Sequence, residues 1–389
     1  MREKTYSVGP LLLSPKDSGD RRRLKRLSTD KGVFFVDEFK QQRKELFLCR
    51  NPRLKLDPNR AQQEAYKFLM SQKGKEAFDK QGVWVYYDWL KTLVHILPRR
   101  EYEELRTARN RNLITRKEQH AFKNFKIGII GLSVGNSVAL CIALEGAERL
   151  RLADHDSIDL SNLNRIRGGL HGLGTNKAIF TARQIYELNP YAVVDVWANG
   201  IEEKKLRRFL KSIDIVVDEM DDVVLKLRLR EEARKLRIPV VSAADNGDNA
   251  IVDVERFDKE PRREIYHGLL GEINIDNVKK ATFREKFDLI NKMVGIEYVT
   301  SRMKQSLLLV GKEIYAWPQL GGAAFLSGAA LTYAIRKIAI GEKMPSGKYD
   351  VSLDRVFNPL YDSAPARRSR LKESQRFISE FRKNISKNK

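Results

Sequence analysis

Short apolar runs alternate with helical patterns over residues 126–242 of this chain. The helical segments end at breakers such as Gly146 and Asn189-Pro190. Alternation at this spacing builds a mainly parallel, doubly wound α/β sheet, and no other feature of the sequence constrains the fold as much. We predict strands at 127–130, 150–153, 193–196, 213–217 and 239–242, and helices at 137–144, 176–188 and 222–236.

The first 100 residues lack this alternation, so we predict a smaller α+β region there. Residues 82–90 fit a strand or a buried aromatic turn. Helical patterns flank them at 59–70 and 89–96, and Pro98 closes the second. We therefore divide the chain into a candidate peptide- or partner-binding region at 1–100, an α/β domain at 101–365 and a basic helix or tail at 366–389.

The chain is strongly basic, with 73 lysines and arginines against 51 acidic residues and a formal net charge of +22. Such a field attracts acidic partners: a nucleotide, a nucleic acid, an anionic membrane or an acidic peptide. Much of the excess lies at 21–26 and 367–389. Each of these segments, taken alone, fits a solvated end better than a specific binding site.

The rest of the composition fits a globular, cytoplasmic protein, because 42% of the residues are hydrophobic and can bury a core. The most apolar stretch, 320–335, is too short and too rich in glycine and alanine to span a membrane. The start of the chain has no apolar signal core, so export is not expected. Cys49 and Cys141 form neither a disulfide framework nor a CxxC pair, which fits a reducing compartment.

A small-residue turn, Gly131-Leu-Ser133-Val-Gly135, follows the first predicted strand and opens a helix. It could cradle phosphates at the helix N-terminus. It could also serve a nicotinamide cofactor with Asp154 as the ribose-binding acid, or form a G-x-S-x-G nucleophile elbow with Ser133 as the nucleophile. The turn alone does not decide between these three interpretations. However, besides His155 the only histidines after the turn are His171 and His267, and neither follows a clear strand. A nicotinamide site leaves the polar residues after Asp154 unexplained.

Polar residues gather after the second and fourth predicted strands. They are Asp154-His-Asp156, Ser161-Asn162-Leu-Asn164-Arg165, Lys177 at a helix start, and Asp218-Glu-Met-Asp221-Asp222. Because the carboxyl ends of parallel strands meet at one edge of a sheet, we expect these residues to converge. The set suits the attack of a carboxylate on the α-phosphate of ATP. Cations neutralise the phosphates, one aspartate holds Mg²⁺, and another grips the ribose.

Residues 109 to about 244 resemble the ThiF/MoeB-like adenylyltransferases, relatives of the ubiquitin-activating enzymes. The family pattern is a glycine turn, then D-x-D and S-N-L-x-R, then a lysine, then an aspartate after the fourth strand. The resemblance implies a Rossmann-like sheet, ATP and Mg²⁺ as cofactors, and adenylation of a carboxylate on a peptide or a ubiquitin-like carrier. It also implies a homodimer, because Arg109 falls on the signature R-x-x-R-[QN], whose second arginine reaches the partner subunit's ATP site.

The resemblance also assigns roles residue by residue. Asp154 corresponds to the ribose-binding acid, Asp221 to the Mg²⁺-binding aspartate, and Asn162, Arg165 and Lys177 to the phosphate contacts. The implied catalytic residues are Arg109, Arg165, Lys177 and Asp221. The implied ATP contacts are Gly131, Ser133, Gly135, Asp154, Asp156, Asn162, Arg165 and Lys177. Taken singly, Asp156, Ser161 and Asp222 also fit turn or cap roles, and the role of Asp218 stays open.

The sequence departs from the family pattern in several places. The glycine turn is one residue shorter, and Ser133 stands where glycine is expected, so the details of phosphate contact stay open. The family's CxxC zinc pairs are absent and neither cysteine has a recognisable activating neighbour, so we expect no zinc and no thioester. The likeness thins beyond Ala244, where 245–248 are expected to form a loop near the site and 317–322 lead into an Ala-rich helix.

These observations leave three functions open. The first is adenylation of an acidic peptide or carrier, including maturation of a ribosomally made peptide. The second is a tRNA-directed adenylating and dehydrating enzyme, because relatives also modify a tRNA base. The third is a non-catalytic, nucleic-acid-associated protein that binds through its basic ends.

Overall fold

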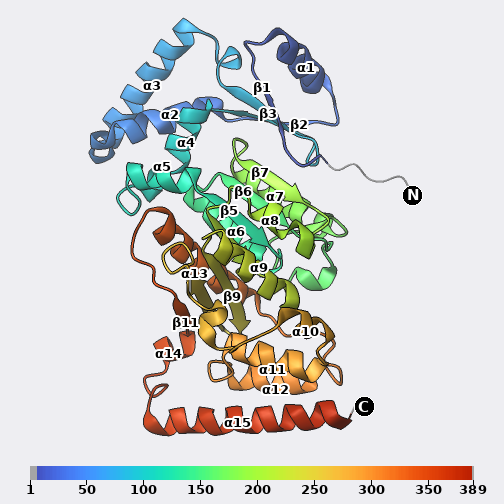
Figure 1. Cartoon of the computed structure of the whole chain (residues 1–389). Helices are drawn as coiled ribbons and strands as arrows, with labels where there is room; N and C mark the ends of the chain where they lie inside the picture. Colours follow the sequence, from blue (N-terminus) through green and yellow to red (C-terminus); the bar gives the residue numbers. More distant parts are fainter. Residues whose placement is uncertain (1–6, 388–389) are drawn as a thin grey trace. The chain divides into compact units, whose positions relative to one another are not determined.

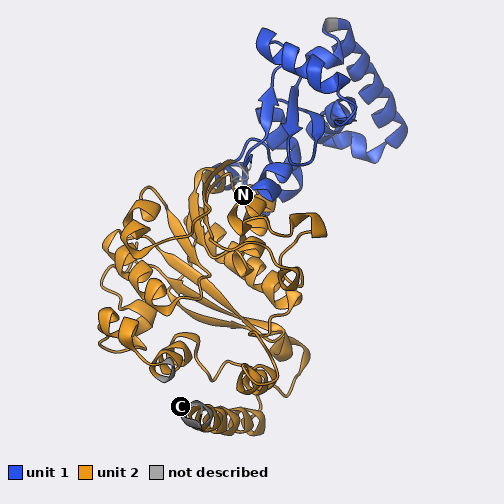
Figure 2. Ribbon diagram, turned by 90° about the vertical axis from the view of Figure 1, so that its right-hand side faces the viewer, with its two compact units in different colours: residues 1–120, 182–192 blue, residues 121–181, 193–389 orange. Residues whose placement is uncertain are grey.

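The computed structural model describes residues 7–387, except the side chains of residues 75, 283, 284 and 384–387. The chain forms two compact units (Figure 2). Unit 1 runs to His120 and includes residues 182–192, and unit 2 consists of residues 121–181 and of the chain from Val193 onwards. Residues 1–6 and 388–389, the ends of the predicted N-terminal region and basic tail, lie outside the described residues.

Unit 1 is an α+β region built on a four-stranded sheet (Figure 1). Its strands are β1 (Leu11–Leu13), β2 (Phe34–Asp37), β3 (Val83–Tyr87) and β4 (Thr92–Ile96), and its helices include α1 (Ser18–Thr29), α2 (Phe39–Arg50), α3 (Pro58–Lys75) and α4 (Arg99–Arg106). The strand order is β1-β3-β4-β2. β3 pairs antiparallel with β1 and β4, and β2 pairs parallel with β4. β1 and β2 are therefore the edges of this sheet.

The helix predicted at 89–96 is wrong, because residues 92–96 form the strand β4. Trp84 of β3 lies opposite His95 of β4, and their rings stack with centroids 4.1 Å apart. β2 pairs with the other side of β4, so a strand from far along the chain fixes the extended backbone. This tertiary pairing overrides a local helical pattern. The helix predicted at 59–70 is confirmed within α3, and the strand at 82–90 is confirmed as β3.

Unit 2 contains a seven-stranded sheet in the order β11-β10-β9-β8-β5-β6-β7. Its strands are β5 (Lys126–Ile130), β6 (Arg149–Ala153), β7 (Val193–Trp197), β8 (Ile215–Asp218), β9 (Val240–Asn246), β10 (Asn249–Glu255) and β11 (Gly347–Val351). The five predicted strands, β5 to β9, pair in parallel with one another. The sequence did not predict β10 and β11, which add an antiparallel edge.

Helices cover both faces of this sheet (Figure 2), so the predicted doubly wound α/β fold is confirmed. The helices of this part of the chain are α5 (Arg116–Asn124), α6 (Val134–Glu145), α7 (Lys177–Leu188), α8 (Leu206–Leu210), α9 (Val223–Lys235), α10 (Ile275–Lys280), α11 (Phe283–Val294), α12 (Ser301–Leu309), α13 (Gly321–Ala339), α14 (Leu353–Phe357) and α15 (Ala364–Lys387). Successive residues of a strand point to opposite faces. Gly128 accordingly faces Phe209 of α8, whereas Ile129 faces Gly135 of α6.

The basic C-terminal segment is a long helix, α15, that packs on α12 (Figure 1). Its Phe381 ring stacks on Phe287 of α11 with centroids 3.5 Å apart. Buried Lys304 of α12 donates from Nζ to Oγ of Ser374, 2.8 Å away. Among the helices of residues 7–387, none has both the length and the apolar character needed to cross a bilayer.

Candidate functional site

The glycine turn connects β5 to the N-terminus of α6. Gly131 has φ +86°, a backbone conformation that suits glycine, and its N–H donates to the carbonyl of Ala153 in β6 (2.9 Å). Ser133 occupies the N-cap position of α6, but its side chain makes no cap hydrogen bond. The first N–H groups of α6, including that of Gly135, therefore point to where an anion could bind.

Gly131→Ala tests how tightly this turn is packed. A Cβ at Gly131 would lie 2.3 Å from the carbonyl oxygen of Glu219, in addition to the strain of a left-handed alanine. We expect the free energy of unfolding to fall by roughly 2–4 kcal/mol. The matched control is Gly174→Ala, because Gly174 has φ +75° with nothing within 4 Å of the added Cβ. That variant should lose only about 1 kcal/mol. Equal losses in urea-induced unfolding would show that the contact with Glu219 is unimportant.

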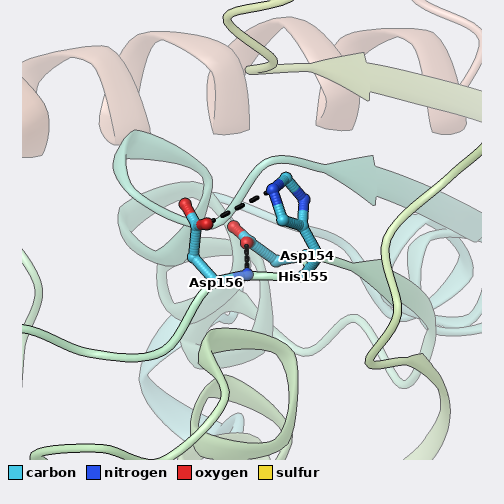
Figure 3. Close-up of side chains that lie close together, drawn as sticks. All are labelled: Asp154, His155 and Asp156. Atoms are coloured by element: carbon cyan, nitrogen blue, oxygen red, sulfur yellow. Dashed lines mark hydrogen bonds and ion pairs between the residues drawn. The ribbon is translucent and has the colours of Figure 1, made fainter.

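Asp154 directly follows β6, where it lies beside His155 and Asp156 (Figure 3), and it supports the glycine turn. One carboxylate oxygen accepts from the N–H of Leu132 at 2.6 Å, and the other accepts from the N–H of Asp156 at 2.8 Å. Burial raises the pKa of Asp154, although these two N–H groups stabilise the charged form. A buried carboxylate fixed beside a glycine turn fits the predicted ribose contact.

Asp156 and Lys177 form an ion pair next to this carboxylate. Lys177 Nζ lies 2.9 Å from Asp156 Oδ2, and the hydrogen bond from Lys177 lowers the pKa of Asp156. Lys177 is the first residue of α7 and is only 8% exposed. His155 Nε2 lies 3.3 Å from the other oxygen of Asp156 (Figure 3). Asp154, His155 and Asp156 lie close enough together to surround a metal ion, but Asp156 is already paired with the ammonium of Lys177, so we assign no metal here.

Arg165 joins the loop after β6 to the glycine turn. Its Nε donates to Ser133 Oγ at 2.7 Å, and its Nη1 donates to the carbonyl of Ser161 and to Asn164 Oδ1. Asn162 is buried, and its Oδ1 accepts from a backbone N–H of the same loop, so it stabilises the loop that carries Arg165. Ser133 Oγ thus contacts a guanidinium rather than a histidine, which does not fit the nucleophile interpretation.

The acids after β8 have different surroundings. Asp221 is exposed, and its carboxylate has no hydrogen-bond partner within the described residues. Asp222 caps α9 by accepting from the N–H of Leu225 (2.8 Å). Asp218 is fully buried. Burial favours its neutral form, but Lys226 and Arg230 outweigh this and lower its pKa. Asp218 is therefore structural, whereas Asp221 is free to bind a ligand.

Electrostatic contacts place Asp221 near Arg165. Burial lowers the pKa of Arg165, and the carboxylates of Asp245 and Asp221 oppose that shift. A continuous series of contacts therefore runs from Lys177 through Asp156, Asp154 and the glycine turn to Arg165. Asp221 makes none of these contacts but lies within electrostatic range of Arg165. These predicted residues of unit 2 lie around one turn at the carboxyl edge of the sheet. The remaining predicted residue, Arg109, is exposed on a short 3₁₀ helix (Ala108–Asn110) of unit 1.

The sequence did not single out Glu219, which directly follows β8. Its Oε1 accepts from the N–H of Ala243 in β9 (2.8 Å), and burial raises its pKa well above the usual range. The position of Glu219 directly after a predicted strand was the feature of the sequence that could have singled it out.

Residues 245–248, predicted as a loop near the site, form the end of β9 and the turn into β10. Asp245 Oδ1 accepts from Ser327 Oγ of α13 (2.8 Å).

A surface cavity of about 630 Å³ lies elsewhere in unit 2 and contains none of the predicted site residues. Ion pairs line it, such as Arg228 with Glu203 and Glu231. We therefore place the candidate site at the glycine turn, where polar groups from several strand ends converge, and not in this cavity.

Comparison with known proteins gives one match to a protein family, described as the ThiF family, over residues 107–327. The chain belongs to the ThiF family. All the predicted site residues lie inside the matched segment, from Arg109 to Asp221. The ThiF domain thus includes the glycine turn and everything that surrounds it.

Several curated proteins are similar to this ThiF protein. One is an uncharacterized protein, MT1398 of Mycobacterium tuberculosis, with 36% identity over 91% of this chain and 47% of its own length. The chain therefore spans about half of that relative. The tRNA threonylcarbamoyladenosine dehydratase of Bacillus subtilis is 25% identical over 47% of this chain and 76% of its own length. The molybdopterin-synthase adenylyltransferase of Haemophilus influenzae is 29% identical over 43% of this chain and 70% of its own length.

Proposed function

We propose that this ThiF protein uses ATP and Mg²⁺ to adenylate a carboxylate on a peptide or small carrier protein, releasing pyrophosphate. The observation that carries the proposal is the series of contacts around the glycine turn, from Lys177 to Arg165, with the exposed Asp221 within electrostatic range of Arg165. At one edge of the sheet there are thus an acid suited to ribose, two cations suited to phosphates and an exposed carboxylate. Adenylation needs this combination to align the attacking carboxylate and to hold the charge of the triphosphate.

Each side chain has a separate task in this proposal. Asp154, fixed by two backbone N–H groups, accepts from a ribose hydroxyl with its remaining lone pairs. Arg165 and Lys177 hold the phosphates above the N-terminus of α6. Asp221 fits a magnesium ligand, because it is an exposed carboxylate close to the phosphate-binding arginine. Bound Mg²⁺ would neutralise phosphate charge as pyrophosphate leaves.

Unit 1 is proposed to capture the peptide. Its edge strand β2 exposes Phe34 (69%) and Phe35 (48%), and its other edge strand, β1, exposes Leu11 (49%). An extended peptide can add to such an edge through backbone hydrogen bonds. The arginines of α1, which follows β1, would attract acidic side chains. These features support an acidic peptide, and maturation of a ribosomally made peptide is the specific process we propose.

A homodimer is the proposed assembly. Arg109 is exposed, and within the described residues it has no assigned internal partner. This arrangement suits an arginine that completes the ATP site of a second copy. Mixing an Arg109→Ala chain with an Asp221→Asn chain should therefore restore part of the activity that each variant lacks alone.

The test is ATP–pyrophosphate exchange with short acetylated acidic peptides that carry a free C-terminus, and with ubiquitin-like carriers. We expect saturable, substrate-dependent exchange that chelation of Mg²⁺ with EDTA abolishes. The proposed function would be overturned if the folded protein binds no ATP and shows no ATP–pyrophosphate exchange with any of these substrates.

The salt dependence of peptide capture gives an independent prediction. Surface charges are largely screened over distances beyond about 10 Å at 0.1 M salt. Because the chain carries a net charge of +22, we expect the Kd for an acidic peptide to rise at least about tenfold between roughly 50 mM and 500 mM salt. Fluorescence anisotropy can measure this. A peptide with amides in place of its carboxylates is the control and should bind weakly at every salt concentration. A Kd that salt does not change would exclude the acidic-peptide proposal.

A tRNA substrate is the second candidate, favoured by the net charge and by the similarity to a tRNA-modifying dehydratase. It predicts ATP turnover that depends on tRNA and not on peptide. A non-catalytic nucleic-acid-binding protein predicts salt-sensitive RNA or DNA binding with no turnover at all.

A further inference from the structure

Most acids at the carboxyl edge of the sheet already have a partner or a proposed task. Asp154 accepts two backbone hydrogen bonds, and Asp156 is paired with a lysine. Asp218 is buried in ion pairs, and Asp222 caps α9. Asp221 is the proposed magnesium ligand. Two acids at the ends of β8 and β9 have no task in the adenylation step.

Asp245 is the better placed of these two to exchange a proton. Glu219 is held by the backbone N–H of Ala243 in β9, and its burial raises its pKa and favours the neutral form, which is a poor base. Asp245 accepts from Ser327 Oγ through Oδ1, whereas within the described residues its Oδ2 accepts only one long hydrogen bond, from Gln319 Nε2 at 3.4 Å. Burial raises the pKa of Asp245, and Ser327 and Arg165 oppose that shift. One oxygen of this carboxylate is thus fixed and the other is weakly engaged.

The strand order places Asp245 away from the ribose. Along the sheet order β6-β5-β8-β9, Asp154 comes first, then the glycine turn, then Asp221, then Asp245. Since Asp154 is the proposed ribose contact, we assign the opposite end of this row, near Asp245, to the acyl group of the substrate. The charges of Asp221 and Asp245 both act on Arg165, so Asp245 lies within electrostatic range of the arginine that we assign to the phosphates.

We propose that Asp245 is the general base of the step that captures the acyl-adenylate. This inference rests on the proposed function. A nitrogen or oxygen nucleophile, an amine or hydroxyl of a substrate, attacks the acyl carbon. The bond from that carbon to the phosphate oxygen breaks, AMP leaves with the electron pair, and the proton of the nucleophile passes to Asp245 Oδ2. The product is an amide or an ester, and no oxidant or reductant is needed.

The test compares Asp245→Asn with the unaltered protein in two assays, using the short acetylated acidic peptides as the carboxylate. Pyrophosphate exchange reports adenylation, and AMP release in the presence of glycine amide as the amine nucleophile reports capture. In the variant we expect AMP release to fall roughly 10²- to 10³-fold, and exchange to fall less than about tenfold. Hydroxylamine reacts with acyl-adenylates without a base, so it should restore most of the AMP release.

Asp248→Asn is the matched control, because it makes the same charge change on the exposed turn after β9. AMP release and exchange should both stay within about twofold of the unaltered protein. If Asp245→Asn lowers exchange as much as AMP release and hydroxylamine restores nothing, Asp245 has a structural or phosphate-site role and the inference is overturned. If the unaltered protein shows no pyrophosphate exchange, the proposed function is refuted, and the inference about Asp245 is refuted with it.

Discussion

Asp221→Asn is expected to reduce Mg²⁺-dependent pyrophosphate exchange by roughly 10²- to 10³-fold while leaving the fold intact. Asp221 is exposed at the end of β8, and within the described residues no internal group uses its carboxylate. Its replacement therefore removes no buried contact. An amide is a weaker ligand for Mg²⁺ than a carboxylate, so the loss should shrink as the Mg²⁺ concentration is raised.

Asp222→Asn is the matched control for this substitution. Asp222 is the next residue and is also exposed, but it caps α9, and asparagine caps helices as well as aspartate does. This variant should keep its exchange activity and its unfolding temperature. Full exchange in Asp221→Asn, measured at limiting Mg²⁺, would remove the proposed metal role. Equal losses in both variants would point to the net charge of the loop instead.

The parallel sheet could be predicted from the sequence because its central strands, β5 and β8, are buried on both faces. Such strands appear as short apolar runs, as in Ile127–Ile130, and the following residues must then lie at one edge. The site residues after β6 and β8 follow directly from that rule. The strands β10 and β11 escaped prediction because their charged residues, such as Glu255 and Lys348, interrupt the apolar pattern. Buried Arg230 compensates the charge of Glu255, and Lys348 donates to the carbonyl of Met293, but only the fold brings these partners together.

Partners in space also explain why single residues were hard to interpret from the sequence. Asp218 and Asp221 are three residues apart with the same chemistry, yet one is buried against Arg230 and the other is exposed. Their side chains point into different surroundings because the strand ends between them. The sequence shows the carboxylates but not the arginine twelve residues further on that neutralises the first.

Lys177→Met should cost about as much activity as the loss of Asp221, with exchange lowered by roughly 10²- to 10³-fold. Methionine keeps the apolar length of the side chain, which is 8% exposed at the start of α7, but removes the ammonium group. Stability should change by about 1 kcal/mol or less, because the paired side chain of Asp156 is 54% exposed and water can solvate it. The measurements are exchange at saturating ATP, the Kd for ATP, and urea-induced unfolding.

Asp156→Asn distinguishes between two roles for Lys177, which are binding of phosphate and stabilisation of the loop after β6. If the ammonium acts on phosphate, removal of its carboxylate partner leaves the cation in place, held at the first turn of α7. The loss in exchange should then be at least about tenfold smaller than in Lys177→Met, and the Kd for ATP should change little or become tighter. If Lys177 serves only to stabilise the loop after β6, the two variants will lose the same activity and the same stability. Equal losses would therefore assign Lys177 to the architecture of the loop and leave Arg165 as the cation that holds the triphosphate.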